Sequence, residues 1–169
     1  MKLFVITGTC GAGKSTMINA LKERLDSSRY LVIDNDAVGL NWWDYAGTDH
    51  EEEYADDCLK EAVRLAGDRD IVFGTCMNPQ DYFAKNTVSE CVEATFFAAL
   101  SPGAEAIEDR LRNRPSERGF TTDDARRPHI MYEEWFRKNK SKFQLFLDTS
   151  SLTEEQTADT IEEYILKWT

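Results

Sequence analysis

Gly8-Thr9-Cys10-Gly11-Ala12-Gly13-Lys14-Ser15-Thr16 is the stretch of this sequence that decides the fold. Its glycines, lysine and serine fit the spacing G-x-x-x-x-G-K-[ST]. The residues just before it, Leu3 to Ile6, form a short apolar run suited to a buried parallel strand. Beyond it, apolar residues recur at helical spacing, at Met17, Ile18, Leu21 and Leu25. The sequence therefore predicts a strand, a glycine-rich loop and a helix in direct succession.

Loops of this composition bind phosphate. Gly8, Gly11 and Gly13 permit the backbone angles that turn successive N–H groups inward, and the following helix points the positive end of its dipole at the same place. Lys14 is expected to reach the β- and γ-phosphates of ATP, and the Ser15 hydroxyl to ligate Mg²⁺. We expect the whole stretch to bind the nucleotide. The alternative is a glycine-rich turn that binds no ligand.

Composition places the chain among ordinary globular proteins. Its 169 residues suffice for one domain with a core of its own. The net charge of −11, from 31 acidic and 20 basic residues, disfavours nucleic acid and anionic membranes as partners. We find no signal segment or apolar span, and the four cysteines lack the spacing of a metal site or disulfide framework. We expect a cytoplasmic monomer or homodimer.

The other apolar runs predict further strands that alternate with helices. Strands are expected at residues 29–33, 70–74, 94–100 and 143–147. Helices are expected at residues 54–66, about 80–85, 105–113 and about 130–136, with a last one after the capping box of Thr153 and Gln156. This alternation implies an α/β fold, in which a parallel sheet is covered on both faces and ligands bind beyond the carboxyl ends of its strands.

Three more stretches are typical of small kinases: Asp34-Asn35-Asp36, Arg110 to Pro115, and Leu147 to Thr153. GTP-binding switches fit less well, because the chain offers only Asn139-Lys140-Ser141-Lys142 where they carry N-K-x-D. With the phosphate loop, these stretches resemble the shikimate kinase and adenylate kinase group of small P-loop kinases over most of the chain. The resemblance implies a three-layer P-loop NTPase fold with five parallel strands in the order 2-3-1-4-5.

The resemblance also implies a flap at about residues 37–53 and a lid at about residues 114–128. The lid segment lacks a helical apolar face, so we expect a mobile loop there. By the resemblance, Asp34 would help to hold Mg²⁺, and Asp36 would accept the proton of the acceptor hydroxyl. The alternative is that one or both carboxylates cap the segment that follows them.

Arginines are expected to complete the ATP site. Arg110 and Arg114 stand four residues apart and so share one helix face, where the resemblance has the first stack on adenine and the second approach the phosphates. The alternative is a solvated face of ion pairs. Candidates to neutralise the transferring phosphoryl group from the lid are Arg118, Arg126 and Arg127. The adenine edge should meet the loop around Ser150.

The acceptor side departs from this resemblance. Nucleoside monophosphate kinases and shikimate kinase hold an anionic acceptor with arginines in the flap and after the third strand. Residues 37–53 and 74–84 contain no Lys or Arg, and the flap is rich in acids: Asp44, Asp49, Glu51, Glu52 and Glu53. Because carboxylates repel an anion, we expect a neutral or cationic acceptor, such as a nucleoside, a sugar or an amino-bearing metabolite.

Several residues near this acceptor have two interpretations. Trp42 and Trp43 would offer a platform for a planar base or a sugar face, or they would pack the flap against the core, which is the simpler interpretation. Asn78 would bond an acceptor hydroxyl, or it would serve as a turn residue before Pro79. Cys10 is interpreted as a small filler of the loop rather than as a reactive thiol.

The sequence thus favours an enzyme that transfers the γ-phosphoryl group of ATP, with Mg²⁺, to a hydroxyl of a small molecule. One alternative is a nucleoside monophosphate kinase in which lid arginines or Arg137 grip the acceptor phosphate. Another is a kinase that modifies antibiotics or sugar nucleotides. An alternative of a different class is a regulatory ATP-binding module that hydrolyses slowly or not at all.

Overall fold

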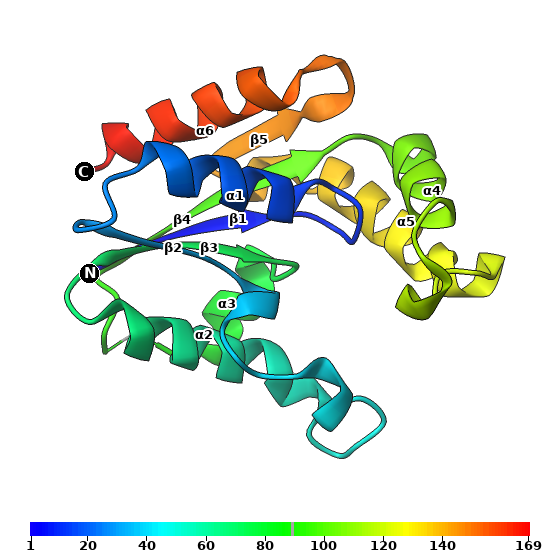
Figure 1. Ribbon diagram of the computed structural model, residues 1–169, viewed down its shortest axis with the longest axis horizontal. Helices are drawn as coiled ribbons and strands as arrows, with labels where there is room; N and C mark the ends of the chain where they lie inside the picture. The colour runs from blue at the N-terminus through cyan, green and yellow to red at the C-terminus, as the bar shows by residue number, and fades with distance from the viewer. Residues whose placement is uncertain (89) are drawn as a thin grey trace.

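The apolar runs form the strands of one sheet. They are β1 (Lys2–Thr7), β2 (Tyr30–Asp34), β3 (Asp70–Thr75), β4 (Ala94–Ser101) and β5 (Leu145–Asp148). The computed structural model describes residues 1–88 and 90–169, and in it all strand pairs are parallel in the order β2-β3-β1-β4-β5 (Figure 1). The predicted fold class and strand order are therefore confirmed.

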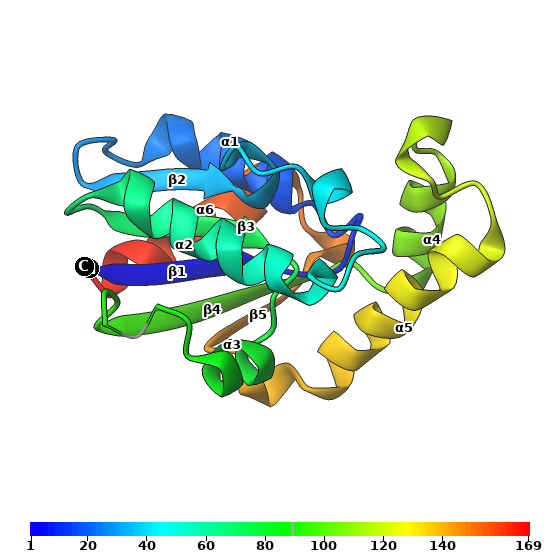
Figure 2. The ribbon, with the colours of Figure 1, turned by 90° about the horizontal axis from the view of Figure 1, so that it is seen from below.

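Helices cover both faces of this sheet (Figures 1 and 2). They are α1 (Lys14–Arg24), α2 (Tyr54–Ala66), α3 (Pro79–Lys85), α4 (Ala104–Arg112), α5 (Asp123–Lys138) and α6 (Glu154–Lys167). One face carries α1 and α6, and the other carries α2 and α3. In the part of the chain that the structure describes, no helix has both the length and the apolar character that crossing a bilayer requires.

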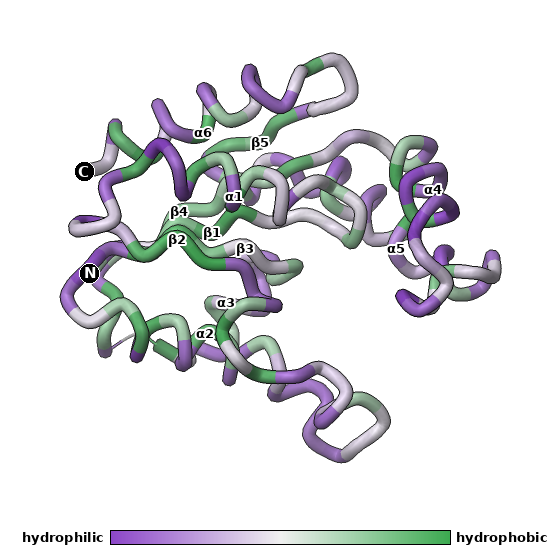
Figure 3. Tube along the Cα trace, viewed as in Figure 1, coloured by the Kyte–Doolittle hydropathy of each residue, from purple (hydrophilic) through white to green (hydrophobic). Residues whose placement is uncertain are grey.

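The central strand β1 shows why the apolar runs become strands. Leu3 and Val5 are buried in one core with side chains of α2 and α5, whereas Phe4 and Ile6 are buried in the other core with side chains of α1 and α6. A strand between two helical layers therefore needs apolar residues at every position. Hydropathy follows the same plan in Figure 3, where the sheet is mainly hydrophobic and the arm formed by α4 and α5 is mainly hydrophilic.

The segments that the sequence predicts to be functional lie at the carboxyl ends of the strands. The loop between β1 and α1, the segment 37–53 and the α4–α5 arm all extend from this end of the sheet, while both termini lie at the other end (Figures 1 and 2). The segment 37–53 contains two short 3-10 turns, Trp42–Asp44 and Glu51–Glu53. The parallel sheet thus brings stretches that are distant in sequence to one edge.

The prediction of a loop as far as residue 128 is wrong. Helix α5 begins at Asp123, where Thr122 caps it by accepting a hydrogen bond from the Ala125 N–H at 3.2 Å, and Pro128 lies inside the helix. The buried positions of this helix include two charged residues, Arg126 and Glu133. A search for apolar periodicity misses such a helix, because part of its inward face is polar.

The close approach of the phosphate loop to β4 makes a stability prediction. A Cβ atom on Gly8, which has φ +155°, would lie 2.7 Å from the Leu100 carbonyl oxygen and 2.7 Å from the Ala12 Cβ. Gly8→Ala should therefore lower the free energy of unfolding by about 2–4 kcal/mol in urea titrations. The control Gly47→Ala, at φ +74° with no atom within 4 Å, should cost about 1 kcal/mol. Equal losses in the two variants would contradict the steric explanation.

Candidate functional site

The phosphate loop presents backbone donors at the start of α1. Gly11 and Gly13 have φ +87° and +101°, a region that residues with a Cβ avoid. Gly13 is the N-cap of α1, and within the described residues no side chain accepts a hydrogen bond there. The first N–H groups of the helix therefore have no intrahelical partner and lie at the positive end of the helix dipole. This arrangement suits an anion such as phosphate.

Lys14 folds back over this loop. Its Nζ donates to the Thr9 carbonyl oxygen at 3.0 Å, and the Thr9 hydroxyl donates to the His129 carbonyl oxygen at 3.1 Å. Burial acts to lower the pKa of Lys14, but the Cys76 and Cys10 sulfurs, together with Asp34, outweigh it and hold the pKa above its ordinary value. The ammonium group therefore stays charged. The contact with α5 through His129 has no signal in the sequence.

The carboxylates that end β2 differ in their surroundings. Asp34 Oδ1 accepts a hydrogen bond from the Asp36 N–H at 3.2 Å, so Asp34 caps the turn that follows, as the alternative interpretation predicted. Its Oδ2 is buried and has no hydrogen-bond partner among the described residues. Asp36 is exposed at the same edge of the sheet. Because a buried carboxylate oxygen needs a donor or a cation, Asp34 fits a role beside a metal ion.

The same edge fits Mg²⁺ better than a metal held by protein alone. No group of three or more His, Cys, Asp or Glu side chains within residues 1–88 and 90–169 could hold a metal ion. Mg²⁺ is commonly bound by one or two protein oxygens, with substrate phosphates and water completing its shell. Asp34 and the exposed hydroxyl-bearing residue Ser15 are the protein groups that fit this chemistry.

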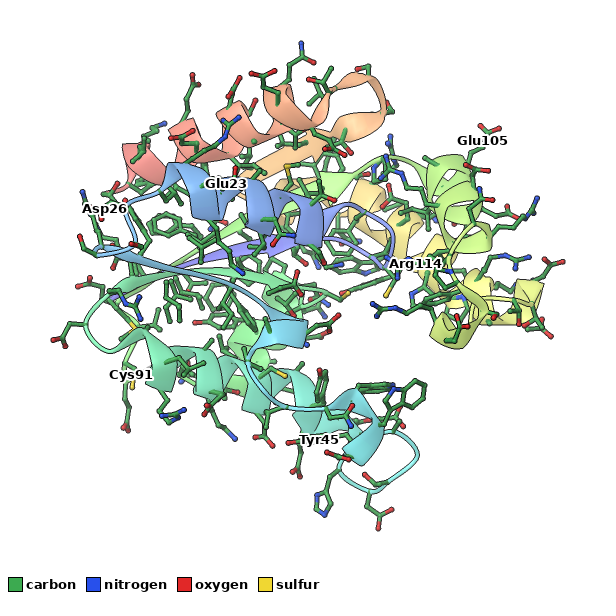
Figure 4. All side chains as sticks on the ribbon, viewed as in Figure 1. Glu23, Asp26, Tyr45, Cys91, Glu105 and Arg114 are labelled. Carbon is green, nitrogen blue, oxygen red and sulfur yellow. The ribbon has the colours of Figure 1, made fainter. Side chains whose placement is uncertain are left out.

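Two arginines from α4 and its C-terminal end lie at the loop. Arg110 Nη1 donates to the Gly11 carbonyl oxygen at 3.0 Å. Arg114 stacks with its guanidinium carbon 5.5 Å from the centre of the Phe120 ring, and Figure 4 shows it on the side of the arm that faces the loop. The predicted alternative is an ion-pair face on this helix. A different arginine forms such a pair, since Arg112 Nη2 lies 2.6 Å from Glu108 Oε1. Arg110 and Arg114 thus lie beside the loop or on the side of the arm that faces it, and their contact with a nucleotide stays a prediction.

The arginines of the predicted lid fall into two groups. Arg118 and Arg127 are exposed, and their guanidinium groups form no ion pair with the described residues. Arg126 is only 5% exposed and donates to the Phe120 carbonyl oxygen at 2.8 Å and to the Asp123 carboxylate. Its guanidinium group holds the start of α5 and is not available to a phosphoryl group. Arg118 and Arg127 remain the lid candidates.

The two tryptophans of the flap differ in how far they are packed against other side chains. The Trp42 ring packs edge-on against Tyr54 with centroids 5.2 Å apart, and Tyr45 does the same at 5.1 Å. Trp42 therefore follows the packing interpretation. Trp43 is 71% exposed. Trp42 is less exposed, at 38%, so Trp43 is the better placed of the two tryptophans, and its role as a platform stays a prediction.

Asn78 acts as a helix cap. Its Oδ1 accepts a hydrogen bond from the Asp81 N–H at 3.0 Å, and its Nδ2 donates to the Asp81 carboxylate at 2.6 Å and to the Tyr132 hydroxyl at 3.0 Å. The residue is 5% exposed. This geometry matches the turn interpretation, and contact of Asn78 with an acceptor stays a prediction.

A buried network ties α5 to the ends of β4 and β5. Glu133 accepts hydrogen bonds from the Ser101 hydroxyl at 2.5 Å and from the Gly103 N–H at 2.9 Å. Arg137 donates to the Ser101 carbonyl oxygen at 3.1 Å and to Asp148 at 3.1 Å. Glu133 carries no signal in the sequence, because apolar residues are expected at the buried positions of a helix.

Ser150 lies at the other end of this network. Its hydroxyl donates to the Asp148 carboxylate at 2.6 Å. This bond, together with the bond from Arg137, holds the pKa of Asp148 at about 2. A cavity of about 910 Å³ between α4 and the end of β5 includes Ser150 and Arg137 in its lining. Ser150 thus borders open space beside α4, and contact of its loop with the adenine edge stays a prediction.

Two thiols meet beside the phosphate loop. Cys10 lies in the loop that follows β1, Cys76 directly follows the neighbouring strand β3, and each thiol affects the ionisation of the other. The neighbouring Cys76 thiol, with the positive charges of Lys14 and Arg114, lowers the pKa of Cys10 to about 6 against the opposing effect of burial. The Cys10 thiol and burial in turn raise the pKa of Cys76. The interpretation of Cys10 as a small filler does not include this interaction with Cys76, because the two cysteines are far apart in the sequence and show no C-x-x-C spacing that would predict it.

Comparison with known proteins agrees with this geometry. Residues 5–132 match a family model described as an AAA domain. No curated protein sequence matches the chain.

Solved structures share the fold. The shikimate kinase from Acinetobacter baumannii in complex with shikimate has a TM-score of 0.64 at 16% identity, covering 99% of this chain and 94% of that one. The tunicamycin resistance protein of Deinococcus radiodurans has a TM-score of 0.63 at 18% identity, and the match covers 97% of this chain and 95% of that one. The deoxyadenosine kinase from M. mycoides with bound products has a TM-score of 0.56 at 16% identity, and the match covers 99% of this chain and 100% of that one. The resemblance to small P-loop kinases is thus confirmed in the fold.

The thiol pair makes a prediction about reactivity. Alkylation of Cys10 by iodoacetamide should rise with pH around a midpoint near pH 6, because the thiolate is the nucleophile. Cys58 should stay unmodified over the same range, since burial raises its pKa to about 11. Peptide mass spectrometry of samples quenched at each pH measures both rates. A Cys10 midpoint near the ordinary thiol value of about 8.5 would contradict the charge environment described above.

Proposed function

The chain belongs to the AAA domain family, and from this premise we propose that it is an ATP-dependent kinase acting on a hydroxyl of a small neutral or cationic molecule. The observation that carries the proposal is that the phosphate loop lies beside two carboxylates, Asp34 at the end of β2 and Asp36 in the turn that follows. Asp34 is close enough to raise the pKa of Lys14, and Asp36 is close enough to oppose ionisation of Cys10. A phosphate-binding site beside a carboxylate is the arrangement that phosphoryl transfer to a hydroxyl needs.

The loop and its arginines bind ATP in this proposal. Backbone N–H groups at the start of α1 and the Lys14 ammonium hold the β- and γ-phosphates. Arg110, already bonded to the loop at Gly11, stacks on the adenine, and Arg114 approaches the phosphates. The orphaned Asp34 oxygen and the Ser15 hydroxyl would hold Mg²⁺, which supplies charge neutralisation on the phosphates when bound.

The acceptor hydroxyl meets Asp36. This carboxylate is exposed at the sheet edge, so it can orient the hydroxyl and accept its proton during transfer. Arg118 and Arg127 neutralise charge on the transferring group when the lid segment approaches the loop. Their exposure and lack of ion pairs with described residues support this role, since no bond has to break first.

The flap favours an acceptor without negative charge. Asp44, Glu53 and His50 help to line a flap cavity of about 550 Å³, and His50 Nδ1 contacts Glu53 at 3.2 Å. No Lys or Arg occurs in residues 37–53. An anionic acceptor would have no partner there, whereas a hydroxyl or amino group would. The deoxyadenosine kinase among the fold neighbours supports a nucleoside-like acceptor with Trp43 as its platform.

If the chain were a nucleoside monophosphate kinase, Arg137 would be one candidate to grip the acceptor phosphate, but its contacts disfavour that role. Arg137 is held between Glu133 and Asp148 at 3.3 and 3.1 Å, and it also donates to the Ser101 carbonyl oxygen. Gripping an acceptor phosphate would break this network and leave Glu133, which is fully buried, without its charged partner. The free-energy cost of breaking this network argues against Arg137 as the residue that grips an acceptor phosphate.

A panel of acceptors tests the proposed activity. With Mg²⁺ and ATP, coupled ADP release should appear with nucleosides, sugars or aminoglycosides and stay at background with nucleoside monophosphates. Lys14→Ala should lower the activity by about 10²–10³-fold, because it removes a charge contact made in the transition state. Turnover with phosphorylated or carboxylated acceptors alone would contradict the acceptor class. ATP hydrolysis that no acceptor increases would instead support the regulatory module.

Replacing the proposed base separates binding from catalysis. Asp36→Asn should lower kcat by about 10²–10⁴-fold and change the ATP dissociation constant by less than about threefold, because a general base acts on the acceptor. Steady-state kinetics and calorimetry measure the two effects. Asp68→Asn is the matched control. Asp68 is exposed and precedes the start of β3, so it lies at the end of the strands opposite to Asp36. Full activity of Asp36→Asn would remove Asp36 from its role.

A further inference from the structure

Cys10 and Cys76 are brought together by the two central strands. β1 and β3 are neighbours in the sheet, with Thr7 paired with Thr75, so the residues that follow both strands leave the sheet side by side. The Thr7 hydroxyl donates to the Met77 carbonyl oxygen at 2.6 Å, and the Tyr132 hydroxyl donates to the Cys76 carbonyl oxygen at 2.9 Å. The backbone around Cys76 is therefore held from two sides, facing the loop.

The surroundings of this pair suit thiolate chemistry. Cys10 and Cys76 are both partly exposed, free thiols, so a small reagent can reach them. Positive charge comes from Lys14 and Arg114, and the opposing negative charge is Asp36. A partly exposed cysteine beside cationic groups and a second thiol is the usual setting of a redox-active cysteine.

We propose that Cys10 is an oxidation site, at which a hydroperoxide such as hydrogen peroxide leads to a Cys10–Cys76 disulfide that prevents the phosphate loop from binding ATP. The chemistry of the thiol pair stands apart from the kinase activity. The effect on ATP rests on the proposed function, because it requires ATP to occupy this loop.

The reaction balances in two steps. The Cys10 thiolate attacks one oxygen of hydrogen peroxide, the O–O bond breaks, and the departing hydroxide takes up the thiol proton to form water, leaving a sulfenic acid on Cys10. The Cys76 sulfur then attacks the Cys10 sulfur, the S–O bond breaks, and the hydroxide leaves with the Cys76 proton as a second water. Two thiols are oxidised to one disulfide, and one peroxide is reduced to two waters.

The disulfide would change the loop itself. A disulfide requires an S–S separation of about 2.05 Å, and both cysteines are free thiols here. Because the backbone around Cys76 is held by two hydrogen bonds, closing the bond must move Cys10 toward the end of β3. Cys10 stands directly before Gly11, whose carbonyl oxygen binds Arg110, and directly after Thr9, whose carbonyl oxygen binds Lys14. Both contacts flank the proposed triphosphate position. Displacing Cys10 therefore shifts the backbone donors that ATP needs.

The experiment maps the cross-link and measures ATP binding on the same samples. The reduced full chain is treated with hydrogen peroxide, remaining thiols are blocked with N-ethylmaleimide, and the digest is searched for the Cys10–Cys76 peptide. We expect this cross-link as the main product, with ATP affinity by calorimetry weakened by about tenfold or more and restored by dithiothreitol. Prior addition of Mg²⁺ and ATP should slow the cross-linking, since bound phosphates disfavour a thiolate beside them.

Two variants test whether Cys76 is the thiol that resolves the oxidised Cys10. Cys76→Ser removes the resolving thiol, so oxidation should stop at a sulfenic acid on Cys10 that dimedone traps. Cys91→Ser is the matched control, because Cys91 is exposed and lies at the opposite end of the molecule from Arg114 (Figure 4). This control should keep both the cross-link and the loss of ATP binding. If Cys76→Ser fails to fold, protection of the unaltered chain by ATP still tests the site.

The outcomes distinguish the two proposals. Peroxide treatment that oxidises Cys91 without producing the Cys10–Cys76 peptide overturns the oxidation site. Formation of the cross-link with unchanged ATP affinity overturns its effect on the loop. Failure of the reduced chain to bind ATP contradicts the proposed function instead, and the peptide map then still decides whether Cys10 and Cys76 form a disulfide.

Discussion

The structure depends on a loop that ends at the N-terminus of α1, where the first N–H groups of the helix are open to an anion. This loop leaves the central strand β1, approaches the β4 backbone at Gly8, and turns into α1 at Gly13 without a side-chain cap among the described residues. Burying unpaired backbone donors is costly in most of a protein, so such a loop is stable only at an edge that water or a ligand can reach. The carboxyl edge of a parallel sheet provides that place.

The same edge gathers the groups that chemistry on a phosphate requires. The order β2-β3-β1-β4-β5 places the end of β2, with Asp34 and the nearby Asp36, on one side of the loop, and α4, which follows β4 and carries Arg110, on the other. Negative groups thus stand toward the flap and positive groups toward the α4–α5 arm. This separation is consistent with an anionic donor under the arm and an uncharged or cationic acceptor at the flap.

Much of this fold could be predicted from the sequence, because buried parallel strands and the phosphate loop leave strong local patterns. The start of α5 could not, since its inward face includes Arg126 and Glu133, whose partners lie at Phe120, Ser101 and Gly103. The Cys10–Cys76 pair was equally hidden. It arises because β1 and β3 are neighbours in space, and neither cysteine carries a local signal.

Nuclear magnetic resonance of the backbone amides tests the central claim most directly, because the phosphate contact is made by the main chain. On titration of the reduced protein with Mg²⁺ and ATP, the largest shifts should fall on the amides of Gly11, Gly13, Lys14 and Ser15, with those of α6 nearly unchanged. A titration in which these loop amides do not respond to ATP, or respond less than α6, would contradict the loop as the nucleotide site.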